Sequence, residues 1–343
     1  MKRNLLTFAT TILMGLSSLI AQTIIVQDAE GNNARLYTDL ETAVNGANSG
    51  DYLYLSGGTY DITSTWKGYD GKGSYTNYLV IDKPLHFVGA GYRQGADTPY
   101  IKGGRFAFRK SASGSSVTGL LMENLYLDSV SNARISRSKV SNHLYLCGVG
   151  LNGIITECEL YSITNLYNFT NLSGDAYYSY TISKNIIENQ NIGNGGLYNA
   201  TIKNNIVRMY ISAKNSTIEN NIVLNPNKTS TTIGGENSVV RNNILLYDKI
   251  ALGQGGDYSG NMEELNPEDV FMDFANKDYR LKETCPGKNA GTDGTDIGIY
   301  GTEYPFKDSR IPSIPCFLNK SIASETEADG KLKVNITIEA QER

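Results

Sequence analysis

The middle of the chain repeats one pattern of apolar and polar residues. In the segments TISKNII, TIKNNIV, TIENNIV and VVRNNIL, an asparagine follows an apolar residue by three positions. Successive copies are separated by roughly twenty residues with variable inserts, which predicts a solenoid whose turns bury their apolar sides against one another. The apolar residues and their partners are Leu121/Asn124, Ile135/Ser138, Ile155/Cys158, Ile182/Asn185, Ile202/Asn205, Ile218/Asn221, Val240/Asn243 and Tyr258/Asn261.

Each repeat contains short runs rich in β-branched residues, which are too short for helices and are typical of strands. Parallel strands coiled in this way stack neighbouring turns about 5 Å apart, so equivalent side chains form columns along the axis. Asparagine tolerates a left-handed bend, and its amide can donate to the next asparagine and accept from the previous one. The asparagine column is therefore expected to satisfy buried polar groups, and its role is structural.

Charged residues beside the asparagines alternate in sign from one repeat to the next. Opposite charges facing each other on stacked strands are mildly favourable, whereas like charges are not. Exposed pairs contribute only about 0–1 kcal/mol each, so these columns are interpreted as solvated ion pairs rather than as an active site. The two columns are Glu123, Arg137, Glu157 and Lys184, and Lys203, Glu219 and Arg241.

Both ends of the repeat region differ from it. Thr38–Ala47 predicts a short helix with a capping box of Thr38 and Glu41, followed by a strand at 52–55, which would close the first turn of the solenoid. Residues 266–301 are turn-rich, and three prolines then indicate a stiff linker. The strict alternation at 332–340 predicts one half-buried strand that either closes the far end or pairs elsewhere.

Composition limits the classes of function. The net charge is −4 and no basic run is long, which excludes a typical nucleic-acid-binding protein. The first 21 residues resemble a secretory signal, with Lys2 and Arg3 before an apolar stretch and Ala21 at the cleavage point, although an uncleaved anchor is the alternative. The expected organisation is a signal peptide at 1–21, a β-helix at 22–301 and a linker with a C-terminal strand tail at 302–343. The mature protein is expected to be an exported monomer that is periplasmic, cell-surface or secreted. It should have no membrane span once the signal is removed.

The four cysteines match no zinc-binding spacing. Export would permit disulfides, and Cys285 with Cys316 is one candidate pair. Cys158 occupies a position in the asparagine column, where a small buried thiol is expected.

The repeated NN-I pattern, the N-terminal helix and the segment GDYLYLSGGTYDI resemble the right-handed parallel β-helix superfamily, which includes pectate lyases, polygalacturonases and chondroitinase-B-like lyases. The segment DYRLKETCPGKNAGTDGTDIGIYG is similar to the closing segment of secreted β-helix proteins of Bacteroidetes-type bacteria. The resemblance implies an all-β, right-handed parallel β-helix with a short N-terminal capping helix and a C-terminal strand appendage. It does not imply one activity, because this solenoid carries several.

Catalytic motifs of these families are sparse in this chain. Polygalacturonase-like hydrolysis needs paired carboxylates, and the Asn-Thr-Asp, Asp-Asp and Gly-His-Gly segments of those enzymes are absent. The resembling lyases use a lysine or arginine base, often with calcium, and the candidate bases of this chain are Lys139, Arg134 and Arg208. No aspartate cluster resembling a calcium site lies beside them, so no metal ligand and no cofactor are assigned, with calcium only in the lyase alternative.

Binding a sugar without cleaving it requires no catalytic residues, since sugar rings stack on exposed aromatic faces. The longest interval of the repeat, from Cys158 to Asn185, holds an insert rich in tyrosines. The leading hypothesis is an exported protein that binds a polysaccharide or cell-surface glycan on an outer face, and the alternatives are a calcium-dependent uronan lyase and a structural or assembly protein of the cell surface. The expected ligand-binding residues are Tyr161, Tyr167, Asp175, Tyr177 and Tyr178.

Overall fold

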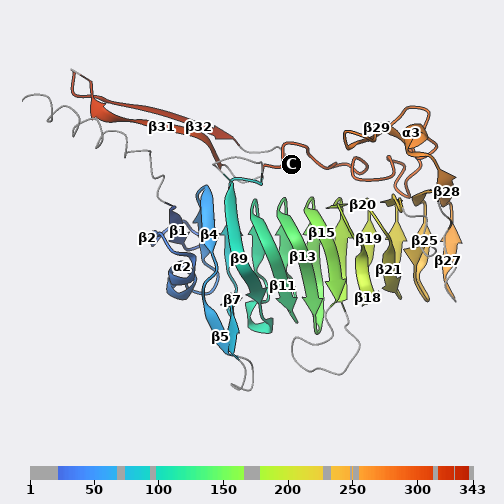
Figure 1. Cartoon of the computed structure of the whole chain (residues 1–343), viewed down its shortest axis with the longest axis horizontal. Helices are drawn as coiled ribbons and strands as arrows, with labels where there is room; N and C mark the ends of the chain where they lie inside the picture. The colour runs from blue at the N-terminus through green and yellow to red at the C-terminus, as the bar shows by residue number, and fades with distance from the viewer. Residues whose placement is uncertain are drawn as a thin grey trace, which may run out of the picture.

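The computed structural model describes residues 22–67, 74–92, 98–165, 178–226, 233–247, 249, 255–311, 316–327 and 329–339. The predicted signal segment 1–21 lies outside these residues. The described chain is a parallel β-solenoid of about 7 turns, which confirms the predicted all-β architecture (Figure 1).

Two large sheets form the solenoid. Sheet A has 12 strands, and neighbours pair in parallel except at the N-terminal end, where β1 is antiparallel to β2 and β3. In spatial order its strands are β2 (Arg35–Tyr37), β1 (Ile24–Gln27), β3 (Tyr52–Leu55), β8 (His86–Val88), β10 (Ser116–Thr118), β12 (Arg134–Ser136), β14 (Gly150–Thr156), β16 (Tyr178–Ser183), β19 (Thr201–Lys203), β22 (Thr217–Glu219), β25 (Val239–Arg241) and β27 (Asp257–Ser259).

Sheet B has 14 strands and is bent along its length, because register shifts divide its long strands into two halves. Four long strands run through both halves of the sheet: β9 (Pro99–Phe108), β11 (Leu121–Asp128), β13 (Lys139–Cys147) and β15 (Glu159–Asn165). We call the half that contains their first residues face B1, and it includes six shorter strands. We call the half that contains their last residues face B2, and it includes four shorter strands. The shorter strands of B1 are β4 (Gly58–Asp61), β17 (Ile186–Ile187), β20 (Ile206–Val207), β23 (Ile222–Val223), β26 (Ile244–Leu246) and β28 (Met262–Leu265), and those of B2 are β7 (Tyr78–Ile81), β18 (Ile192–Tyr198), β21 (Ile211–Lys214) and β24 (Ile233–Gly234).

The core is built from columns of apolar side chains inside the coil. On sheet A, one column runs from Phe87 through Val117 and Ile135 to Ile202 and Val240, and each of these side chains is buried. Because each turn packs only on its neighbours, the core is long and narrow, as in other solenoids.

The asparagine column has the predicted hydrogen bonds. The Nδ2 of Asn205 donates to the Oδ1 of Asn221 at 2.9 Å, and the Oδ1 of Asn205 accepts from the Nδ2 of Asn185 at 3.0 Å. The same oxygen accepts the backbone N–H of Asn185, while Nδ2 also donates to the carbonyl of Ile182. Asn243 extends the column to Asn261. These bonds satisfy polar groups that are otherwise costly to bury.

Two details of the predicted column are wrong. The left-handed residue is the one before each ladder asparagine, for example Lys184 with φ 55° and Asn204 with φ 55°. Asn124 is not a member, since it pairs with Arg105 within sheet B. The first member is Leu120, whose backbone N–H donates to the hydroxyl of Ser138 at 3.3 Å. An apolar side chain therefore starts the column, which the asparagine pattern could not indicate.

Ion pairs form along the predicted charge columns. Glu157 contacts Arg137 at 2.5 Å and Lys184 at 3.1 Å, and Arg241 lies 3.5 Å from Glu219. The prediction is wrong for Glu123, because this residue accepts hydrogen bonds from Tyr100 and from the backbone of Gly103 instead. The pairs stabilise the stacking of turns, but those of Glu157 are not solvated as predicted, because its side chain and those of Arg137 and Lys184 are only 12–15% exposed.

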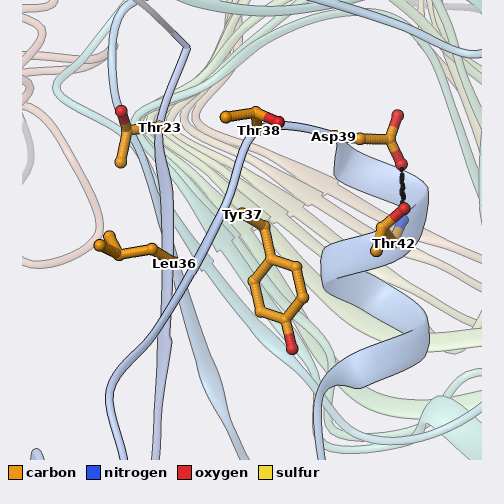
Figure 2. A pocket seen from close by; sticks show the side chains of 6 residues that line it. All are labelled: Thr23, Leu36, Tyr37, Thr38, Asp39 and Thr42. Carbon is orange, nitrogen blue, oxygen red and sulfur yellow. Dashed lines mark hydrogen bonds between the residues drawn. The ribbon is translucent and has the colours of Figure 1, made fainter.

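Helix α2 (Leu40–Gly46) packs at the N-terminal end of the solenoid (Figure 1). Its N-cap is Asp39 rather than the predicted Thr38, and the Asp39 carboxylate accepts the backbone N–H of Thr42 at 2.7 Å (Figure 2). The buried side chains of Leu40, Ala43 and Val44 form the expected apolar stripe. The helix therefore covers core residues that the first turn would otherwise expose.

After β28 the chain turns back along the solenoid (Figure 1). We call residues 267–311 the strap; it contains α3 (Pro267–Val270), β29 (Phe271–Asp273) and β30 (Asp278–Leu281). The left-handed asparagines hold it in place: the amide of Asn242 donates to Ala290, and that of Asn204 donates to Gly298. The predicted C-terminal strand is present and pairs elsewhere, the second of its two predicted alternatives: β32 (Leu332–Glu339) forms an antiparallel hairpin with β31 (Cys316–Thr326).

Small elements complete the described chain. They are the hairpin of β5 (Thr65–Lys67) with β6 (Ser74–Thr76) and the 3-10 helix η1 (Lys110–Ala112). Cys158 and Cys285 are buried free thiols, so the candidate disulfide to Cys316 is not formed. Burial raises the pKa of Cys158 to about 12, which fits the structural role expected for it.

Candidate functional site

One outward-facing column of face B1 changes character along the axis. In the later turns it consists of isoleucines, and the strap covers them with its own apolar residues, among them Leu281, Ile297 and Phe306. In the earlier turns the column is polar or mixed, and Arg310 of the strap lies beside it. In register, the column reads Thr59, Tyr100, Leu121, Lys139, Glu159, Ile186, Ile206, Ile222, Ile244 and Met262.

A hollow of about 550 Å³ lies where the strap ends. Its residues come from β4, β9, β11, β13 and β15, together with Tyr92, Thr98 and Arg310. We call this hollow the groove. Arg310 of the strap lines it together with residues of this column.

Charged side chains are concentrated at one end of the groove. The carboxylate of Glu159 is only 3% exposed, and it lies 2.9 Å from the Nζ of Lys139 and 2.5 Å from the guanidinium of Arg310. Lys139 also contacts Glu188 at 3.2 Å, and Glu188 contacts Lys277 of the strap at 3.1 Å. A buried carboxylate needs such partners, since an unpaired buried charge is strongly destabilising.

Tyr92 supplies an unusual polar group. Its side chain is 3% exposed, yet its hydroxyl has no hydrogen-bond partner among the described residues. The guanidinium of Arg310 lies 5.8 Å from the ring centroid. Burial raises the pKa of Tyr92, and the nearby charge of Glu159 raises it further, so the hydroxyl stays protonated. A protonated, buried and unpaired hydroxyl that lines a cavity is a donor available to a ligand.

The opposite end of the groove carries neutral hydroxyl groups. Thr59 and Thr98 line it, with Ser141 on the same strand as Lys139, and the hydroxyl of Tyr100 donates to Glu123 at 3.1 Å. Hydroxyls and a half-buried tyrosine ring beside charged groups are the side chains that sugars contact in proteins.

The three candidate bases for a lyase do not meet. Lys139 lies in the groove, whereas Arg134 is exposed on β12 of sheet A. Arg208 follows β20 on face B1, where its charge acts on Tyr279 of the strap. Burial alone would lower the pKa of Lys139, but Glu159 and Glu188 outweigh it, so this pKa is raised. A protonated lysine cannot accept a proton, and this disfavours Lys139 as a base at neutral pH.

Of the five residues expected to bind ligand, Tyr161 is the one whose side chain is described. It is half-buried on β15, and its ring lies edge-on to His143 with centroids 5.2 Å apart. Tyr167, Asp175 and Tyr177 lie outside the described residues, and Tyr178 is placed by its backbone at the start of β16.

Sequence reasoning missed Tyr92, Tyr100, Glu159 and Arg310. The sequence did contain a signal for Glu159. This residue directly follows the ladder residue Cys158, and the equivalent position in later repeats is an isoleucine. Arg310 gave no signal, since it lies in the aperiodic strap far from its partner in sequence.

A second hollow, of about 410 Å³, lies at the N-terminal end between β2 and α2 (Figure 2). It is lined by Leu36, Tyr37, Thr38 and Asp39, with Thr23 and Thr42. Asp39 and Thr42 already bond to each other in capping the helix, so this hollow offers fewer free polar groups than the groove.

Across the described part of the chain, no group of three or more His, Cys, Asp or Glu side chains is positioned to hold a metal ion. Within the same residues, no helix has the length and apolar character of a membrane span. No protein-family model matches the chain, and no curated protein matches its sequence.

Proposed function

We propose that this protein is exported and binds an acidic polysaccharide in the groove on face B1, without cleaving it. The observation that carries the proposal is the buried Glu159 with Lys139 and Arg310 around it, beside the hydroxyl of Tyr92, which has no partner among the described residues. The side chain of Arg310 is 43% exposed, and a guanidinium has further N–H donors that can pair with an anionic group of a ligand.

The charge balance favours an anionic ligand. The linked group contains the cations Lys139, Arg310 and Lys277 and the anions Glu159 and Glu188, so its formal charge is +1. The whole chain is acidic, with a net charge of −4. A local positive site on an acidic surface attracts an anionic sugar to one place instead of retaining polyanions everywhere.

Binding fits the groove better than bond cleavage does. Elimination from a uronate needs a group that accepts a proton, and Lys139 is held protonated by its two carboxylates. Hydrolysis needs one protonated and one ionised carboxyl group across the scissile bond. Glu159 is instead ion-paired and buried, and this arrangement suits recognition.

The test is retention of polysaccharides by affinity electrophoresis and calorimetry. Polygalacturonate, alginate and chondroitin sulfate are the acidic probes, and dextran is the neutral one. We expect retention of at least one acidic polymer and not of dextran. Replacing Arg310 by alanine should weaken that binding roughly tenfold or more, because a charge-assisted hydrogen bond is lost.

Arg280→Ala is the matched control, since Arg280 is an exposed strap arginine that pairs with Asp278 on the strap itself. It should bind like the wild type. If no acidic polymer is retained, the proposal fails. If the protein forms unsaturated uronates, which are detected by their ultraviolet absorbance, it cleaves the polymer and the lyase alternative is correct instead.

A further inference from the structure

The two ends of the groove differ in charge. The linked ion pairs around Glu159 have a formal charge of +1 at one end. We call the opposite end, which Thr59 and Thr98 line, the hydroxyl end. Tyr100 lines the groove there, and its hydroxyl donates to a carboxylate oxygen of Glu123 at 3.1 Å. The hydroxyl end therefore has an anion beside it rather than a cation.

The carboxylate of Glu123 is fixed at the hydroxyl end. Its second oxygen accepts the backbone N–H of Gly103 at 3.0 Å. Burial raises the pKa of Tyr100, and the negative charges of Glu123 and Asp61 raise it further, so both carboxylates act at this place. Lys102 is in register with Asp61 and carries a positive charge. The formal charge of Asp61, Lys102 and Glu123 together is consequently −1.

The two ends are too far apart to contact the same sugar ring. Tyr100, Leu121 and Lys139 occupy matching positions on three successive strands. Neighbouring strands lie about 4.8 Å apart, so the backbones of Tyr100 and Lys139 are separated by about 10 Å. A polysaccharide that follows the column places different sugar residues at the two ends. The side chain of Leu121 and the ring of Tyr100 offer apolar surface between them.

We infer that the groove selects a polysaccharide in which an acidic sugar stands next to an uncharged one. The acidic group pairs with Arg310 and Lys139, while hydroxyls of the neighbouring sugar donate to Glu123, whose carboxylate has lone pairs beyond the two in use. A second acidic group at that position meets Glu123 with like charge, and such repulsion is a means of specificity. This inference rests on the proposed function and names the class of polysaccharide.

The experiment compares each acidic polymer with a form that carries fewer charges. The pairs are polygalacturonate with its partly methyl-esterified form, alginate with its partly esterified form, and chondroitin sulfate with unsulfated chondroitin. Calorimetry with the full-length protein should show that the less charged member of a retained pair binds roughly twofold to fivefold more tightly. A site that attracted polyanions through charge alone would give the opposite order, because binding would weaken as charges were removed.

Glu123→Gln removes the repelling charge and keeps an oxygen that can accept from Tyr100. It should raise the affinity for the more highly charged member of a pair roughly twofold to fivefold, so that the preference disappears. Asp61→Asn is a second variant, at an exposed side chain, and should act in the same direction by less because solvent screens its charge. Glu268→Gln, at an exposed position of α3, is the control and should bind both members like the wild type (Figure 1).

The outcomes separate this inference from the proposed function. If the wild-type protein retains no acidic polymer, the proposed function itself is wrong. If it retains one, but the more highly charged member of the pair binds as tightly as the other or more tightly, the groove does not select by charge spacing and the inference is wrong. The inference also fails if Glu123→Gln and Asp61→Asn, with unchanged thermal midpoints, both leave the ratio of the two affinities as it is in the wild type.

Discussion

Asn204 and Asn205 are adjacent in the chain, but their amides serve opposite sides of the wall. Asn205 is inside the solenoid and donates to Asn221, while Asn204 donates outward to the carbonyl of Gly298 in the strap. The left-handed backbone of Asn204 produces this reversal. Asn205 thus joins its turn to the next turn, whereas Asn204 joins the same turn to the strap.

Replacing these two asparagines should have unequal effects. Asn205→Ala leaves several buried groups without partners and should lower the free energy of unfolding by roughly 3 kcal/mol or more, at about 1–3 kcal/mol for each unsatisfied group. Asn204→Gly keeps the left-handed backbone and loses one hydrogen bond, which costs about 1 kcal/mol. Urea denaturation measures both.

The control for Asn204→Gly is Asn215→Gly. Asn215 is also left-handed, with φ 49°, but it is exposed on another edge of the coil. It should change stability by less than Asn204→Gly does. Equal losses for Asn204→Gly and Asn205→Ala would contradict the division of roles between them.

Gly91 sets the position of the strap end. It has φ 110°, and a Cβ placed there would lie 2.7 Å from the carbonyl oxygen of Arg310. Gly91→Ala should displace this end from the groove and reduce ligand affinity as well as stability. Gly114→Ala is the matched control, because Gly114 has φ 91° with open space around it. It should lower stability through backbone strain while ligand affinity stays the same, and a similar loss of affinity would exclude the steric explanation.

Stability should decrease in mildly acidic solution because of the two histidines. Burial lowers the pKa of both His86 and His143 below 6.5. Below that pH the unfolded chain binds protons that the folded chain does not, so stabilisation present above about pH 6.5 is lost as the pH falls toward the folded pKa values. The double variant His86→Gln and His143→Gln should flatten this dependence. Urea midpoints between about pH 5 and pH 8 measure it, and an unchanged slope would rule the histidines out.

The half-buried ion pairs should matter more than the exposed ones. Glu157 joins Arg137 and Lys184, and Glu157→Gln should cost about 1–3 kcal/mol, because two cations lose a charged partner in a poorly solvated place. Glu264 has the same left-handed backbone, with φ 56°, and pairs with Lys249 in an exposed position. Glu264→Gln should cost less than about 1 kcal/mol. Thermal unfolding of both variants decides whether burial sets the size of the effect.

The repeat by itself determined the solenoid. Each of the later turns carries its own apolar residue and ladder asparagine, as Ile202 and Asn205 do, and interacts mainly with its neighbours. Because every turn must bury similar side chains against its neighbours, similar residues recur along the sequence, and this repeat can be recognised without the structure. The N-terminal helix was also predictable from its apolar stripe, although its cap was not, because Thr38 and Asp39 are both good N-cap residues.

Only the tertiary structure decided where the strap runs, that β32 pairs with β31, and where the groove lies. The contact of Arg310 with Glu159 joins an aperiodic segment to one position of a periodic column. Such contacts depend on register between distant segments, and no local pattern of residues encodes that register.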